Sequence, residues 1–247
     1  MKKLIALVLS LCLLTGALTA IAETAPAAVN ESAAQESNAI TITRDELFET
    51  ARAFVRAGED AKGFALFEFL ADRGDAESQN NLGWMYDEGR GVEKSVENAN
   101  RYYKMAADQG LDKAQYNLAM NYDFVLKDYP KAMEYYQLAA AQGHAKAINN
   151  IGDMYENARG VEQDYARAME YYQDSLDKGY DYALTSIGYM YENGLGVEPD
   201  LAKAVEYYRL AADNGVENGV NHLNRLIEEG KIVKEYRIVQ DSSQPDE

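Results

Sequence analysis

The chain has few of the residues that build disulfide frameworks or metal sites. Its 247 residues include one cysteine, Cys12, and two histidines, His144 and His222. Cys12 lies inside the apolar run 4–14, and neither histidine belongs to an H-E-x-x-H pattern or another common ligand pattern. We therefore predict no metal site and no cofactor, and we expect a hydrophobic core without disulfides to stabilise the fold.

Apolar runs are also scarce. Two lysines precede the run 4–14, and an Ala-Ile-Ala triplet ending at Ala22 follows it, as in a secretory signal peptide. The run is shorter than the roughly 20 residues of a transmembrane helix. We expect cleavage after Ala22 and a periplasmic or secreted protein without a transmembrane segment. Lipidation at Cys12 is an alternative, although Leu11 stands where a lipoprotein signal usually has a small residue.

Positive charge is in short supply. The net charge of −17 opposes binding to nucleic acid or anionic lipid and would favour a basic protein partner, although it also serves solubility. Residues 23–42 are rich in Ala, Glu, Ser, Thr and Asn and contain no aromatic residue. Such a segment buries too little apolar surface to fold, so we interpret it as a disordered spacer. Residues 230–247 are interpreted as a C-terminal tail.

The rest of the sequence repeats. Similar phrases end at glycines spaced by 36, 33, 36 and 36 residues, at Gly74, Gly110, Gly143, Gly179 and Gly215. A fixed period in this range is typical of a solenoid of stacked supersecondary units. The predicted solenoid spans residues 43–229, with units at about 43–74, 75–110, 111–143, 144–179 and 180–215 and a closing helix at 216–229.

Each full unit predicts two helices. The first helices are expected at about 76–87, 113–124, 146–157 and 182–193. The second helices are expected to begin at the N-caps Ser95, Asp128, Asp164 and Asp200, whose side chains accept a bond from a first-turn amide. Small residues in the middle of each first helix indicate close approach by its paired helix: Gly83, Ala119, Gly152 and Gly188. The predicted fold class is all-α, a right-handed α-solenoid of stacked helix pairs.

The phrase at 82–92, Leu-Gly-Trp-Met-Tyr-Asp-Glu-Gly-Arg-Gly-Val, is followed by paired tyrosines at 102–103 and by Ala-Ala-Asp-Gln-Gly at 106–110. This pattern resembles the Sel1-like repeat, a relative of the tetratricopeptide repeat, in a secreted bacterial member. The resemblance covers residues 74–215 well, although the second unit lacks the glycine loop.

The resemblance implies an adaptor that binds a protein. Secreted bacterial members restrain periplasmic sensors, support envelope assembly or contact host proteins. A cysteine-rich branch is associated with β-lactam binding or hydrolysis, but this chain lacks the cysteines of that branch. We expect a non-enzymatic scaffold for protein–protein interaction. The alternatives are a cell-wall or β-lactam-related hydrolase and a module that binds glycan or peptidoglycan fragments.

The search for catalytic residues gives one motif. Ser175 to Lys178 spells S-x-x-K, but the S-D-N and K-T-G motifs of serine β-lactamases are missing. Ser175 also occupies a position that holds alanine in the other full units. We therefore interpret Ser175 as a small residue at a helix contact, and no catalytic residue is predicted.

A partner is expected to bind the concave face, which the first helices line. The positions two before and two after the core Leu or Ile of these helices differ between units and include aromatic residues typical of interface hot spots. The predicted groove residues are Asn80, Trp84, Tyr116, Met120, Asn149, Asp153, Thr185 and Tyr189. The alternative is that neighbouring first helices bury these side chains. Tyr86, Tyr122, Tyr155 and Tyr191 recur in every full unit and are predicted to be core residues.

Overall fold

The computed structural model describes residues 42–233, and this part of the chain contains helices and connecting turns but no strand. The predicted signal peptide, all of the predicted spacer except residue 42, and residues 234–247 of the predicted tail lie outside the described residues. Between residues 42 and 233, no helix is long and apolar enough to span a bilayer.

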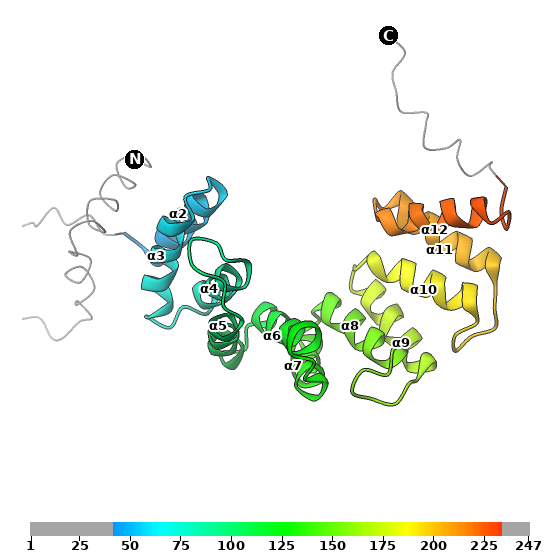
Figure 1. The fold of residues 1–247 in the computed structure, drawn as a ribbon, viewed down its shortest axis with the longest axis horizontal. Helices are drawn as coiled ribbons and strands as arrows, with labels where there is room; N and C mark the ends of the chain where they lie inside the picture. The colour runs from blue at the N-terminus through cyan, green and yellow to red at the C-terminus, as the bar shows by residue number, and fades with distance from the viewer. Residues whose placement is uncertain (1–41, 234–247) are drawn as a thin grey trace, which may run out of the picture.

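The helices follow one another in pairs. They are α2 (Arg44–Arg56), α3 (Asp60–Ala71), α4 (Ala76–Glu88), α5 (Val96–Asp108), α6 (Asp112–Met120), the π-helix η2 (Asn121–Leu126), α7 (Tyr129–Ala141), α8 (Ala145–Glu156), α9 (Tyr165–Asp177), α10 (Tyr182–Asn193), α11 (Leu201–Asp213) and α12 (Glu217–Glu228). Each helix packs on the next, and α12 closes the stack against α11. The pairs form a curved row with α4, α6, α8 and α10 on its inner side and α5, α7, α9 and α11 on its outer side (Figure 1). The predicted α-solenoid is confirmed.

Local signals in the sequence place the helix ends correctly. Ser95, Asp128, Asp164 and Asp200 each accept a hydrogen bond from the backbone amide three residues later, which confirms the four predicted N-caps. The five glycines that close the units all have φ between 78° and 89°, a left-handed conformation that glycine adopts without steric cost. Short turns therefore link one unit to the next.

The small residues in the first helices make room for a tyrosine ring. A β-carbon added to Gly83 would lie 2.5 Å from the ring of Tyr103, and one added to Gly188 would lie 2.7 Å from the ring of Tyr208. Both rings are at most 2 % exposed. The close approach predicted for these positions is thus confirmed, and it is an aromatic side chain of the paired helix that occupies the space.

The prediction that Tyr86, Tyr122, Tyr155 and Tyr191 are core residues is wrong in its details, because each is only partly buried. Tyr155, for example, stacks on Tyr171 with 5.7 Å between ring centroids. The fully buried ring of that unit belongs to the next residue, Tyr172. Consecutive residues of a helix point about 100° apart. Tyr172 is therefore buried against Gly152 of the first helix, while Tyr171 stacks beside it on Tyr155 of the same helix.

The second unit departs from the others where its loop is three residues short. Helix α6 ends at Met120, and the chain continues as the π-helix η2 to Leu126. Lys127 then adopts a positive φ of 57° and leads into the N-cap Asp128. The expected single helix over 113–124 is therefore divided, because the chain must widen its last turn to reach α7 without the usual glycine loop.

Candidate interaction surface

The eight predicted groove residues form two rows along the first helices. The N-terminal row, nearer the start of each helix, consists of Asn80, Tyr116, Asn149 and Thr185. The C-terminal row, one turn further along, consists of Trp84, Met120, Asp153 and Tyr189. The structure gives these rows different surroundings.

Two residues of the N-terminal row, Asn80 and Tyr116, border an open hollow of ≈ 480 Å³. The hollow extends over α4, α6, the start of α8 and the turn before α10, and it is lined by Asn80, Lys113, Tyr116, Asn117, His144, Ala145, Lys146, Gly179 and Tyr180. Asn80 and Tyr116 were predicted to bind a partner; the other seven were not. Lys113 and Lys146 are the third residue after a closing glycine, and this shared position is the signal that could have identified them.

Contacts between units hold the walls of the hollow in place. The amide of Asn117 donates a hydrogen bond of 3.0 Å to the side-chain oxygen of Asn80 on α4. The imidazole of His144 stacks on Tyr116 with 4.6 Å between ring centroids, and its Nδ1 accepts a bond of 3.3 Å from the amide of Ala147. Burial lowers the pKa of His144, so the ring is neutral at neutral pH and acts as an N-cap.

Positive charge gathers at this hollow. Lys113 and Lys146 are both exposed, and neither forms an ion pair with any residue between 42 and 233. The ammonium of Lys146 lies 6.0 Å from the ring centroid of Tyr180. Both lysines lower the pKa of His144, and Asp112 raises it. The hollow therefore offers two cations that the described chain does not neutralise.

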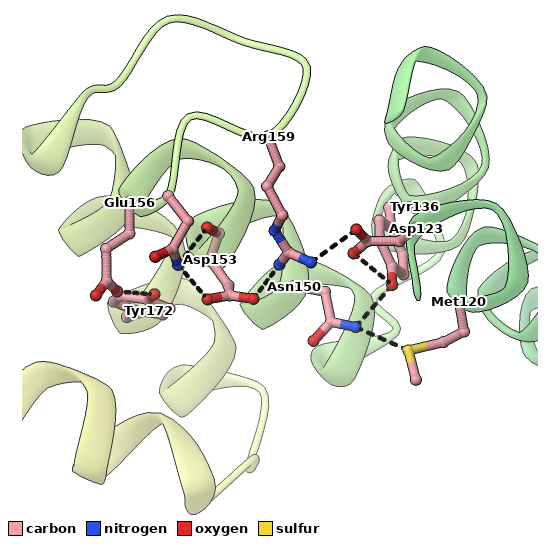
Figure 2. A network of polar contacts seen from close by, with 9 residues as sticks. Met120, Asp123, Tyr136, Asn150, Asp153, Glu156, Arg159 and Tyr172 are labelled. Carbon is pink, nitrogen blue, oxygen red and sulfur yellow. Dashed lines mark hydrogen bonds and ion pairs between the residues drawn. The ribbon is translucent and has the colours of Figure 1, made fainter. Parts of the chain in front are cut away.

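Two residues of the C-terminal row, Met120 and Asp153, form contacts within the repeats where α6 and η2 meet α8. Figure 2 shows Asn150 of α8 between Met120 and Tyr136. Its amide lies 3.2 Å from the sulfur of Met120 and donates a hydrogen bond of 2.9 Å to the tyrosine oxygen. The hydroxyl of Tyr136 in turn donates to Asp123, at 3.4 Å. The amide nitrogen of Asn150, the sulfur of Met120 and the hydroxyl of Tyr136 are therefore bonded to one another within the repeats and are not free to bind a partner.

The same network contains a shared arginine. Arg159, in the loop after α8, pairs with Asp123 at 2.7 Å and also with Asp153 (Figure 2). The side chain of Asp123 is 0 % exposed and that of Arg159 is 16 % exposed. Burial raises the pKa of Asp123, and the charge of Arg159 acts in the opposite direction. Asp153 therefore lies in the groove position as part of an internal ion pair.

The remaining predicted groove residues vary in exposure. Trp84 packs against the apolar clusters on both of its sides, and the guanidinium of Arg90 lies 5.2 Å from its ring centroid. Tyr189 is 40 % exposed. Thr185 is only 8 % exposed and donates a hydrogen bond of 2.7 Å to the carbonyl of Tyr182, so the structure does not present it to a partner. Asn149 is partly buried, and its side-chain oxygen has no hydrogen bond within the described residues.

Two carboxylates at the ends of first helices have equivalent places but different charge environments. Tyr208 donates to Glu192 at 2.9 Å, and Tyr172 donates to Glu156 in the preceding unit. Burial alone would raise the pKa of Glu192, but bonds from Arg225 and Tyr208 lower it below its ordinary value. Glu156 has no cationic partner in the described chain, and burial raises its pKa.

The residues considered for chemistry have structural contacts. Ser175 is fully buried, and its hydroxyl donates a hydrogen bond of 2.8 Å to the carbonyl of Ala145. This confirms the interpretation of Ser175 as a small residue at a helix contact. His222 stacks on Tyr208 with 4.4 Å between centroids. From residue 42 to residue 233, no group of three or more His, Cys, Asp or Glu side chains is arranged to hold a metal ion.

Solved structures resemble this arrangement. A Sel1 repeat protein from Oxalobacter formigenes is 29 % identical, with a TM-score of 0.64 and coverage of 74 % of each chain. The protein c5321, a protective antigen of uropathogenic Escherichia coli strains that displays an SLR fold, is also 29 % identical, with a TM-score of 0.63. That match covers 79 % of this chain and 46 % of c5321.

Sequence comparison gives the same family. A putative Sel1-like repeat-containing protein of Acanthamoeba polyphaga mimivirus is 52 % identical over 48 residues, which are 19 % of this chain and 9 % of the viral protein. The Sel1 repeat itself matches four consecutive stretches, at residues 76–111, 112–144, 145–180 and 181–216. The chain belongs to the Sel1 repeat family.

Proposed function

We propose that this protein is a non-enzymatic scaffold outside the cytoplasm that binds a protein partner on the concave face of its repeats. Proteins built from Sel1 repeats generally mediate protein–protein interactions. The observation that carries the proposal for this face is the open hollow beside Asn80 and Tyr116, which polar, aromatic and cationic side chains from successive units line. Such a surface is continuous over several units, as binding surfaces of solenoids are.

The proposed location rests on the N-terminal sequence. Basic, apolar and small residues follow one another there in the order of a secretory signal peptide. The description of the Escherichia coli relative as a protective antigen fits a protein that leaves the cytoplasm, and we extend that location to this chain. N-terminal sequencing of the protein recovered from a periplasmic or culture fraction should begin at Glu23. An uncleaved Met1 in the cytoplasmic fraction would contradict the proposal.

Affinity capture with matched variants tests the binding face. The full chain is expected to recover a protein partner from envelope extract, and Asn80→Arg and Tyr189→Glu should reduce that recovery, because both change the inner helices α4 and α10. Leu138→Glu is the control, since Leu138 is 45 % exposed on the outer helix α7. Recovery that survives both inner substitutions and is lost with Leu138→Glu would place the interface on the other face.

A further inference from the structure

We infer that the hollow bordered by α4, α6, α8 and the turn before α10 recognises an acidic peptide segment of the partner, with Lys113 and Lys146 pairing its carboxylates. This inference rests on the proposed function and specifies the chemistry of the partner. It reverses the expectation drawn from net charge, which favoured a basic partner.

The charge argument is local. In a chain with a net charge of −17, several exposed lysines pair with a carboxylate within one helical turn, as Lys104 does with Asp108 at 2.7 Å and Lys131 with Asp128 at 2.6 Å. Lys113 and Lys146 have no such partner in the described range. The carboxylates of an acidic segment would supply both ammonium groups with the ion-pair partners that the described repeats lack. Complementary charge also speeds the association of two partners and fixes how they align.

The position of the two lysines makes them a pair. Each is the third residue after the glycine that closes the preceding unit, so they project from the same place on α6 and α8. The equivalent residue of the first unit is Glu77, and that of the fourth unit is Tyr182. The cationic strip is therefore limited to the two central units and defines one site rather than a general property of the face.

The other walls favour a peptide over a sugar. Asn80 accepts the bond from Asn117 through its oxygen, and its own N–H groups donate no hydrogen bond within residues 42–233, so these groups are available to a peptide carbonyl. A sugar ring would need an open aromatic face. Tyr116 is covered by His144, and Tyr180 stacks on Tyr182 with 5.3 Å between centroids.

The test uses the full chain and synthetic eight-residue peptides. Addition of a peptide of alternating Glu and Gly should shift the protein's amide resonances at residues 113–117, 144–146 and 179–180 in NMR titrations at low salt. Alternating Gln-Gly and Lys-Gly should not. The double variant Lys113→Glu/Lys146→Glu should weaken Glu-Gly binding about tenfold or more, since each lysine is replaced by a charge that repels the ligand.

The control is Lys127→Glu, which makes the same charge change at an exposed lysine of the second unit that has no ion pair in the described chain and does not line the hollow. It should alter the affinity less than twofold. Equal loss with Lys127→Glu, equal binding of Gln-Gly, or no binding of Glu-Gly would each overturn the inference. If a captured partner still depends on Asn80 and Tyr189 in those cases, the proposed function stands and only its acidic chemistry fails.

Discussion

The charged side chains at the two ends of helices α6 and α8 differ: two lysines at one end are unpaired in the described chain, whereas ion pairs form at the other end. Near their N-terminal ends, Lys113 and Lys146 are exposed and have no ion pair within residues 42–233. At their C-terminal ends, Arg159 joins Asp123 and Asp153 in a network that is largely withdrawn from solvent. Ion pairs therefore link successive units at the C-terminal ends, whereas at the N-terminal ends two cations stay exposed, and this is where we propose that a partner binds.

The loops explain this difference. Each full loop follows a first helix, and in two of the three full loops an arginine reaches back to the preceding unit. Arg159 contacts Asp123 in this way, and Arg90 contacts both Asp60 and the carbonyl of Val55. The N-terminal ends border the short turns at the closing glycines, and no residue of these turns forms an ion pair with Lys113 or Lys146 within residues 42–233.

The largest expected effect is at the C-terminal ends. Arg159→Ala should lower the free energy of unfolding by about 3–5 kcal/mol, because it leaves the fully buried Asp123 without its cation. Chemical denaturation of the full chain measures this change. Lys127→Ala, which removes an exposed cation of the neighbouring segment, should change it by less than about 0.5 kcal/mol. Similar values for the two variants would show that the network does not couple the units.

A smaller difference in the free energy of unfolding is expected between variants of two C-terminal-row residues, Trp84 and Tyr189. Trp84→Ala should cost about 1–3 kcal/mol, since the ring packs between two apolar clusters without being fully buried. Tyr189→Ala should cost about 0.5 kcal/mol or less, because Tyr189 is 40 % exposed and belongs to none of the apolar clusters within residues 42–233. Thermal melting of both variants compares them directly, and a larger loss for Tyr189→Ala would reverse the assignment.

The matched carboxylates predict a pH-dependent difference. Glu192→Gln should lower stability at pH 7 by about 1.5–3 kcal/mol, the range for hydrogen bonds to a charged group, because Arg225 loses its anion. The pKa of Glu192 is lowered in the fold, so its contribution is present above its unfolded pKa, near 4.3, and is lost as pH falls through the folded value. The cost of Glu192→Gln should therefore shrink in acid.

Glu156→Gln should behave in the opposite way. The pKa of Glu156 is raised in the fold, so its charged form is unfavourable at pH 7, and the neutral amide should leave stability unchanged or slightly higher. That advantage should disappear as pH falls and the carboxylate takes up its proton. Denaturation of wild type and both variants from pH 4 to pH 8 provides the measurement, and parallel profiles for Glu156→Gln and Glu192→Gln would refute the role of Arg225.

Features that repeat could be predicted from the sequence. The N-caps, the closing glycines and the small residues opposite tyrosine rings each recur at a fixed place, and each has a local physical cause. The solenoid follows from them because identical units must pack on one another. The sequence also placed Asn80 and Tyr116 in the predicted groove, since they are large or polar where no core stripe requires them, and both border the hollow; that a partner binds there stays a prediction.

The features that could not be predicted from the sequence depend on contacts between units, and these contacts differ from one pair of units to the next. Whether Asp153 faces solvent depends on Arg159, six residues later, which itself is held by Asp123 of the preceding unit. The π-helix of the second unit arises from a deletion whose structural result no local preference specifies. The lysines of the hollow were missed because exposed lysines are common, and only the folded chain shows that Lys113 and Lys146 line one hollow without an ion pair in the described residues.

Hydrogen–deuterium exchange of the full chain with and without the Glu-Gly peptide tests the contrast between the helix ends most directly. We expect slower exchange in residues 111–117 and 144–149 when the peptide is bound, and unchanged exchange in residues 120–126 and 153–159. Protection of residues 120–126 and 153–159 with no change at 111–117 and 144–149 would contradict the account, because the partner would then bind where the repeats satisfy their own charges.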